Sequence, residues 1–348
     1  MSYKQMTGNI ISATKVEPVG QAASGVWSLQ EQYDYKRGAN WPLIPFGYLS
    51  GGVSDLGLFC SAFSAAQGTD VLDFVTISTT GDAADFGDST ANKYYVQSHG
   101  NATRGITAYG GGGGTGTIDY VEFATKGNAA DFGDTATAFG AQLGGGCGNN
   151  TRGVFGGATA NNSDIMEYVT MASLGNGTDF GNLSQARARL TATSSTTRGV
   201  FAGGFTASAN YVDTIDYITI GSTGNATDFG NLSSGRTFLA GAASATRGVF
   251  AGGYRDGAGN QQNTIDYITI GSTGNATDFG DLTAARSGPA GTSNATRAIF
   301  GGGDEGSAVN TIEYITIGST GDASDFGDLT IVKRWGDAVG SATAAGAA

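Results

Sequence analysis

Short runs of alternating apolar and polar residues make up most of this chain. Residues 214–220, TIDYITI, set β-branched and aromatic side chains at the two-residue period of a strand, and the turn-rich GSTGNA follows. The chain continues with TDFGNL, the small and apolar SSGRTFLAGAASA, and TRGVFAGG, which ends on a glycine pair. No stretch of useful length in residues 46–348 has a helical period. The pattern predicts a unit of four short strands joined by turns.

This unit recurs six times. The triplet DFG, followed by Asp or Asn, begins at six positions that are 46, 48, 49, 50 and 47 residues apart. An acidic residue, in LDF, IDY, MEY or IEY, stands twelve residues before each of them. Four strands in about 48 residues, repeated over residues 46–330, predict an all-β fold, a six-bladed β-propeller of four-stranded blades. The DFG aspartates are Asp85, Asp131, Asp179, Asp228, Asp278 and Asp325, and the acidic residues before them are Asp73, Asp119, Glu167, Asp216, Asp266 and Glu313.

Glycine and aromatic positions follow the same period and predict how the blades pack. Runs such as RGVFGG, RGVFAGG and RAIFGGG end on small residues, and glycine lets backbones approach closely where inner strands crowd around a channel. Each unit also carries two aromatic positions, which we expect to fill the gaps between blades. They are Phe86, Phe132, Phe180, Phe229, Phe279 and Phe326, and Phe74, Tyr120, Tyr168, Tyr217, Tyr267 and Tyr314.

The composition excludes several other classes of protein. Of 348 residues, 60 are Gly, but there is no G-X-Y period and Pro occurs four times, so the chain is not collagen. Two cysteines cannot build a disulfide scaffold, and a single His excludes metal sites with several His ligands. The net charge of −12 argues against nucleic acid as a partner. With no signal peptide and no run of 18 apolar residues, we expect no membrane insertion.

The repeats resemble those of the kelch family and its galactose-oxidase-like relatives. The shared features are a glycine pair that ends one strand, an aromatic residue in the next strand and a second aromatic further on. Here they are Gly203–Gly204, Tyr217 and Phe229 in one copy. Kelch repeats usually have Trp at the last position, whereas this chain has Phe in all six copies. The resemblance covers about 290 residues and implies a kelch-like propeller that is used for binding.

A propeller must close into a ring, and two segments are candidates for the strand that completes blade one. One is residues 45–52, PFGYLSGG. The other is residues 333–346, KRWGDAVGSATAAG, which match the first-strand segment of later repeats, such as residues 285–296. We favour the C-terminal segment. The domains are then an N-terminal arm, residues 1–45, and the propeller, residues 46–348.

The N-terminal arm lies outside the repeats. Residues 24–42, SGVWSLQEQYDYKRGANWP, resemble a stretch near the start of many bacteriophage structural proteins, especially tail-associated ones. The resemblance implies that residues 1–45 dock onto other virion proteins in a larger assembly. The alternative is a strand or turn that packs on the side of the propeller.

Several motifs could carry chemistry, but none has the context that the chemistry needs. DFG holds magnesium in protein kinases, yet the other kinase motifs are missing, so we expect its Asp to cap a turn and its Gly to have a positive φ. The glycine-rich residues 110–116, GGGGGTG, resemble a phosphate-binding loop, but no helix follows them, so they do not predict a phosphate site. His99 alone cannot assemble a galactose-oxidase copper site, no sialidase box is present, and the acidic positions form no D-x-D-x-D-G calcium loop. We therefore expect no catalytic residue, no metal and no cofactor.

A row of arginines also follows the repeat. We expect each to form an ion pair with a DFG aspartate of its own or a neighbouring blade. The alternative is an arginine ring that faces a ligand at one mouth of the channel. The arginines are Arg104, Arg152, Arg198, Arg247 and Arg297.

These observations favour a binding protein over an enzyme. The function we expect is that of a bacteriophage virion protein, made in the host cytoplasm, which binds a host-surface glycan as part of a tail fibre or baseplate. A capsid decoration protein and a non-viral kelch-type interaction module are the alternatives. Variable loops on a constant scaffold would carry the binding, and they include TASANYVD, YRDGAGNQQ and DEGSAV.

Overall fold

The computed structural model describes residues 55–341, apart from a few loop segments, and two short strands of the N-terminal region. The segments left out between 55 and 341 are residues 65–66, 109, 112–115, 137–143, 159–162, 209–210 and 256–259. The chain divides into two units, Met1–Gly52 and Val53–Ala348. In the first unit, β1 (Val16–Val19) and β2 (Ala22–Ser24) form an antiparallel pair. The rest of the predicted arm lies outside the described residues.

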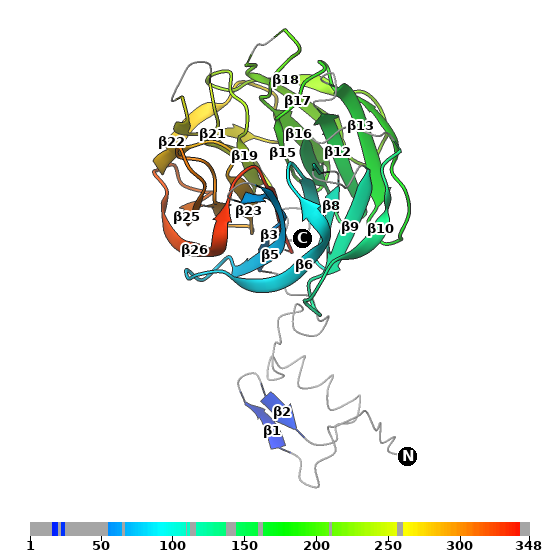
Figure 1. Ribbon diagram of the computed structural model, residues 1–348, viewed down its shortest axis with the longest axis vertical. Helices are drawn as coiled ribbons and strands as arrows, with labels where there is room; N and C mark the ends of the chain where they lie inside the picture. The colour runs from blue at the N-terminus through cyan, green and yellow to red at the C-terminus, as the bar shows by residue number, and fades with distance from the viewer. Residues whose placement is uncertain are drawn as a thin grey trace. The chain divides into compact units, whose positions relative to one another are not determined.

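The second unit is a six-bladed β-propeller, as predicted, and no helix occurs in its described part (Figure 1). Each blade is a sheet of four antiparallel strands, and the small-residue strand is the first of the four. Blade 1 is β27 (Ala338–Gly340), β3 (Leu56–Phe59), β5 (Gln67–Thr76) and β6 (Ala84–Lys93), with β4 (Phe63–Ser64) beside β5; blade 2 is β7 (Gln97–Gly100), β8 (Arg104–Ala108), β9 (Thr117–Glu122) and β10 (Ala130–Asp134); blade 3 is β11 (Gly145–Gly148), β12 (Arg152–Ala158), β13 (Ser163–Thr170) and β14 (Thr178–Asn182). Blade 4 is β15 (Thr191–Ser194), β16 (Arg198–Ala202), β17 (Thr214–Thr219) and β18 (Thr227–Asn231); blade 5 is β19 (Ala240–Ala243), β20 (Arg247–Ala251), β21 (Gln262–Thr269) and β22 (Thr277–Arg286); blade 6 is β23 (Ala290–Ser293), β24 (Arg297–Gly301), β25 (Val309–Thr316) and β26 (Ser324–Lys333).

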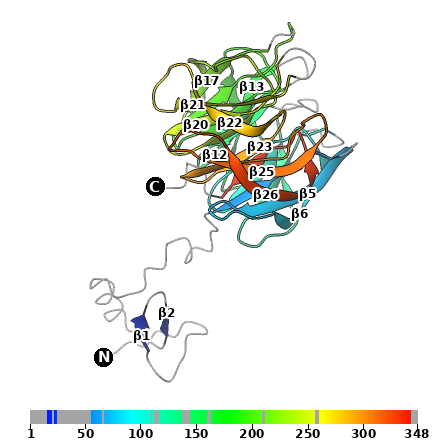
Figure 2. The same ribbon diagram turned by 90° about the vertical axis from the view of Figure 1, so that its left-hand side faces the viewer.

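The C-terminal segment closes the ring, which confirms the favoured alternative. Strand β27 pairs with β3 of blade 1, with Val339 opposite Leu58. The amide of Cys60 also donates to the carbonyl of Asp337 at 2.9 Å. Figure 2 shows β25 and β26 beside β5 and β6, where the last blade meets the first. Residues 45–52, the other candidate, lie outside the described residues.

Close approach of the inner strands explains their small side chains. A Cβ added at Gly146 would lie 2.3 Å from the carbonyl oxygen of Ser98, and one at Gly241 would lie 2.6 Å from that of Ala192. Both oxygens belong to the inner strand of the preceding blade. A serine is accepted in this narrow space because its hydroxyl bonds to the neighbouring strand: Ser293 donates to the carbonyl of Ala243 at 2.7 Å. The inner ring is therefore built from backbone contacts that larger residues would break.

The DFG segment joins each blade to the next through hydrogen bonds. Its glycine has a φ of +145° at Gly230, and a Cβ there would lie 2.4 Å from the carbonyl oxygen of Gly274 in the following blade. The amide of Gly274 donates to the carbonyl of Phe229 at 2.8 Å, and the amide of Asn231 donates to Oδ1 of Asn275 at 3.0 Å. The same side-chain bond occurs at all six blade junctions. Its acceptors are Asn128, Asn176, Asn225, Asn275, Asp322 and Asp82.

The predicted role of the DFG motif is thus half right. The glycines have positive φ, but the capping oxygen comes from the turn of the next blade. The six DFG aspartates are exposed. The phenylalanines are buried between blades, as predicted, and each meets the aromatic residue of its own third strand edge-on, for example Tyr217 and Phe229 at 6.0 Å.

Candidate functional site

A ring of backbone strain surrounds one end of the axial channel. Two or three residues before five of the inner strands, the chain adopts a left-handed conformation with φ between 56° and 63°. We call these five residues the collar: Tyr95, Arg189, Phe238, Gly288 and Trp335. Only one is glycine, although a bulky residue in this conformation is a rare and costly outlier. Backbone strain of this kind clusters at functional sites, so its repetition around the channel mouth indicates that the direction of these side chains matters for function.

Hydrogen bonds between neighbouring collar residues hold this conformation. The amide of Tyr95 donates to the carbonyl of Trp335 at 3.0 Å, and the amide of Trp335 donates to that of Gly288 at 2.9 Å. In the same way, the amide of Gly288 donates to the carbonyl of Phe238 at 2.8 Å, and the amide of Phe238 donates to the carbonyl of Arg189 at 2.9 Å. Each bond joins two blades, so the collar also belongs to the closure of the ring.

The aromatic side chains of the collar converge. The ring centroids of Phe238 and Trp335 are 6.0 Å apart, those of Tyr95 and Trp335 are 5.7 Å apart, and those of Tyr95 and Phe238 are 6.4 Å apart. The planes are tilted by only 31° to 38°. Gly288 makes room for the indole, since a Cβ there would lie 2.3 Å from Trp335. All three rings are partly exposed.

Further aromatic residues extend this cluster over the same end of the propeller. Isolated bridges such as Ala188–Phe205 and Thr237–Tyr254 join the segment that leads into each inner strand to the segment that leaves the second strand. The loops between second and third strands, which vary most in sequence, start here. We call the following partly exposed residues the aromatic face: Phe63, Tyr94, Tyr95, Phe205, Tyr211, Phe238, Tyr254 and Trp335.

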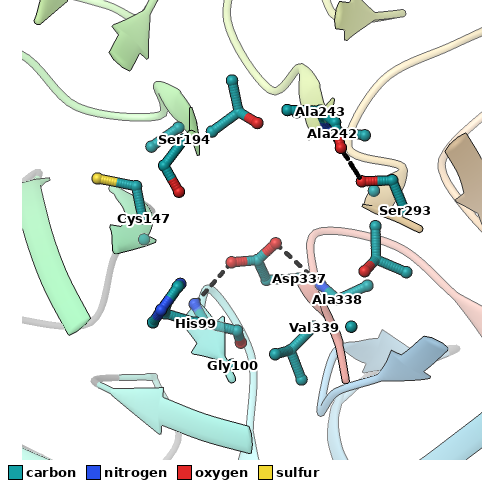
Figure 3. A pocket seen from close by; sticks show the side chains of 18 residues that line it. His99, Gly100, Cys147, Ser194, Ala242, Ala243, Ser293, Asp337, Ala338 and Val339 are labelled. Atoms are coloured by element: carbon teal, nitrogen blue, oxygen red, sulfur yellow. Dashed lines mark hydrogen bonds between the residues drawn. The ribbon is translucent and has the colours of Figure 1, made fainter. Parts of the chain in front are cut away.

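Among the described residues that line the channel beneath the collar, Asp337 supplies the one carboxylate. The six inner strands enclose a cavity of about 60 Å³, and Asp337 points into it (Figure 3). A second cavity of about 20 Å³ shares Asp337 with the first and is lined by Phe238 and Trp335. Oδ2 of Asp337 accepts the amide of Ser98 at 2.7 Å, and Oδ1 accepts the amide of Ala338 at 2.8 Å. Burial nevertheless raises the pKa of Asp337 to about 7.

His99 and Cys147 also line the channel but are not prepared for chemistry. Burial lowers the pKa of His99 to about 4, and its Nε2 lies 3.2 Å from the carbonyl oxygen of Asn149. Burial raises the pKa of the Cys147 thiol, which therefore stays protonated and unreactive. His99 lies in the inner strand β7.

Asp337 and His99 contribute to stability with opposite pH dependence. The pKa of Asp337 is raised above its ordinary 3.8, so its contribution is complete below about pH 4 and is lost as the pH rises to about 7. The pKa of His99 is lowered below its ordinary 6.5, so its contribution is complete above about pH 6.5 and is lost as the pH falls towards 4.

The variant Asp337→Asn isolates the first of these contributions. Between pH 4 and pH 8, the free energy of unfolding of the wild type should fall by about 2–4 kcal/mol relative to the variant, since one pKa unit corresponds to about 1.4 kcal/mol. Urea unfolding of both proteins across this range measures the difference, in which the His99 contribution cancels. Two parallel curves would contradict the raised pKa of Asp337.

The predicted ion pairs between the repeat arginines and the DFG aspartates are wrong. Arg198 lies opposite Thr219 in register, so Tyr217 is its diagonal neighbour, and the guanidinium lies 4.2 Å from the centroid of that ring. Its Nη1 donates to the carbonyl of Ile270 in the next blade at 2.7 Å. The other four arginines repeat both contacts, on Tyr120, Tyr168, Tyr267 and Tyr314. They join blades and form no ligand-facing ring.

A second set of cations, which the sequence analysis missed, pairs with the acidic residue of the IDY strand. Each lies eight residues after a DFG aspartate and reaches into the next blade, as Arg236 does to Asp266 at 2.5 Å. All five pairs are buried. They are Lys93–Asp119, Arg187–Asp216, Arg236–Asp266, Arg286–Glu313 and Lys333–Asp73. The sequence does carry a signal for these pairs, because Lys or Arg stands eight residues after the DFG aspartate in five of six copies. The sixth copy has Phe139 there, which lies outside the described residues.

No protein-family model and no curated protein matches the chain. Among the residues that the structure describes, no group of three or more His, Cys, Asp or Glu side chains is placed to hold a metal ion. In the same part of the chain, no helix has the length and apolar character needed to cross a membrane.

Proposed function

We propose that this chain is a bacteriophage virion protein that binds a glycan of the host surface through the aromatic face of its kelch-like propeller. The observation that carries the proposal is the collar, in which Tyr95, Phe238 and Trp335 are held in a strained backbone conformation at the channel mouth. Strain that is kept in three bulky residues points to function rather than stability.

Sugar chemistry suits this surface. One face of a pyranose ring carries mainly C–H bonds, which pack on aromatic rings, while its hydroxyl groups bond to nearby polar atoms. Tyrosine and tryptophan supply a large apolar area together with a polar tip, and a cluster of exposed aromatics marks an interaction site. The variable loops start beside the cluster, at residues such as Phe205 and Tyr254, and differences between related proteins there would alter specificity.

The virion assignment depends on the N-terminal segment. Residues 24–42 resemble the start of bacteriophage tail-associated proteins, and residues 1–45 would dock onto other virion proteins. The tail fibre or baseplate is the proposed location, and capsid decoration is the close alternative. A non-viral kelch-type interaction module would use the same aromatic face for a protein partner.

Antibody labelling of purified particles of the source phage tests the location. Label at the tail end supports host attachment, label over the head supports decoration instead, and particles without label overturn the virion assignment.

Binding to polysaccharide released from the host envelope tests the glycan. Trp335→Ala should weaken binding at least tenfold, because it removes the largest ring of the collar. Leu174→Ala is the matched control, since Leu174 is exposed, with a relative area of 56%, in a turn between third and fourth strands, which lies at the other end of the propeller. Thermal melting shows whether each variant is folded. Equal binding by Trp335→Ala and the wild type would contradict the proposed site.

A further inference from the structure

Arg189 differs from the other collar residues because it carries a charge. Its guanidinium lies 5.0 Å from the ring centroid of Phe238 and 5.7 Å from that of Phe205. Among the residues that the structure describes, the contacts of this guanidinium are with these two rings, and no hydrogen bond or ion pair of it is found. By contrast, Arg334 on the same face bonds to Asp304.

The left-handed backbone at Arg189, with a φ of 58°, directs this cation towards the aromatic face. The carbonyl of Arg189 is bound on both sides, by the amide of Phe238 at 2.9 Å and the hydroxyl of Thr237 at 2.9 Å. The backbone is therefore fixed, while the planar guanidinium keeps its N–H donors for another group. Two aromatic neighbours hold its plane without using those donors.

The guanidinium also lies within electrostatic reach of the collar tyrosine. Burial raises the pKa of Tyr95, and the positive charge of Arg189 opposes that rise. Phe238 contacts both Arg189 and Trp335, so a sugar stacked on Trp335 or Tyr95 would lie about one aromatic ring away from the cation. Repeat arginines such as Arg198 also lack an acidic partner, but they donate to a backbone carbonyl of the next blade, a bond that the guanidinium of Arg189 does not form among the described residues.

We propose that the aromatic face selects an acidic glycan, whose carboxylate or phosphate group binds the guanidinium of Arg189 while a neighbouring sugar ring packs on the collar aromatics. This inference rests on the proposed glycan binding and adds the class of ligand. Arginine binds both anions through two parallel N–H···O bonds, so the shared chemistry is an oxyanion on a saccharide.

The test uses host envelope polysaccharide in three forms: as isolated, after reduction of its carboxyl groups to alcohols, and after removal of phosphate with hydrofluoric acid. Wild-type protein should bind one of the treated forms about ten- to a hundredfold more weakly than the untreated form. The treatment that weakens binding identifies the anion as carboxylate or phosphate.

Variants of Arg189 assign the effect to this residue. Arg189→Gln should bind the untreated form about ten- to a hundredfold more weakly and should no longer distinguish it from the treated form. The affinity of Arg189→Lys for the untreated form should lie between those of the wild type and Arg189→Gln, because lysine keeps the charge but loses the two parallel N–H donors of the planar guanidinium. Arg189→Gly suits the positive φ, so it should fold and still lose the binding. Lys126→Gln removes the same charge at a turn between third and fourth strands and should bind like the wild type.

The outcomes separate this inference from the proposed function. If wild-type protein binds all three forms equally, or if Arg189→Gln still distinguishes them, the acidic-glycan inference fails and glycan binding stands. If wild-type protein binds none of the three forms, the proposed glycan function fails, and the inference falls with it.

Discussion

Deletion of residues 337–348 should abolish the cooperative folding of the propeller. Strand β27 contributes Ala338 and Val339 to the interior, with relative areas of 7% and 3%, and pairs with β3 over three residues. The loss of one buried Val side chain, with the strand's hydrogen bonds, corresponds to about 4 kcal/mol or more. A protein of ordinary stability has only about 5–15 kcal/mol in total.

The effect should exceed this sum because the strand closes a ring. Without it, β3 becomes an open edge beside the channel, and blade 1 loses the strand that contacts its neighbours β7 and β23 in the inner ring. Urea unfolding measured by circular dichroism should then show a broad transition or an insoluble protein. Deletion of residues 342–348 is the control, since it keeps every described residue of β27. A sharp transition at the wild-type urea concentration in the longer deletion would show that the ring does not need its C-terminal strand.

Arg236→Met should lower the free energy of unfolding by about 3–5 kcal/mol, because it leaves the carboxylate of Asp266 buried without its cation. Both side chains have a relative area of 0%, and Nη2 of Arg236 lies 2.5 Å from Oδ2 of Asp266. Nη1 of the same arginine also donates to the carbonyl oxygens of Gly252 at 3.0 Å and Thr264 at 2.8 Å. The variant therefore removes three contacts between blades 4 and 5. Chemical unfolding at neutral pH measures the loss.

The double variant Arg236→Met/Asp266→Leu separates the pair from its parts. Replacing both charges by apolar groups removes the buried carboxylate as well, so stability should return to within about 1–2 kcal/mol of the wild type. Such recovery would show that the ion pair specifies how blades 4 and 5 dock rather than adding net stability. A double variant as unstable as Arg236→Met would instead assign the loss to the hydrogen bonds of Arg236 with the two carbonyls.

The sequence and the structure agree on the parts of the fold that repeat. The spacing of DFG and IDY predicted six blades, and the match between residues 333–346 and later first strands predicted the closing strand β27. The glycine-rich inner strands were also expected, and Gly146 and Gly241 show why larger residues do not fit. These features follow from local pattern, since each repeat encodes the same four strands.

The partners of charged residues did not follow from the same pattern. Two arginine positions recur in phase with the DFG aspartates, and spacing alone does not show which carboxylate each one meets. Register decides it: Arg198 lies diagonal to Tyr217 within its sheet, whereas Arg236 crosses to Asp266 of the next blade. The DFG aspartates remain exposed on the outermost strands and pair with neither.

The sequence by itself determined the strands and the number of blades and favoured the strand that completes the ring, because these depend on the period of apolar, small and aromatic residues along one chain. Only the tertiary structure decided the site. Tyr95, Arg189, Phe238 and Trp335 share no residue type, and they become a collar with Gly288 because ring closure brings these five equivalent backbone positions together around one axis. The left-handed conformation that aims their side chains is stabilised by hydrogen bonds between blades, and such bonds exist only once the blades have met.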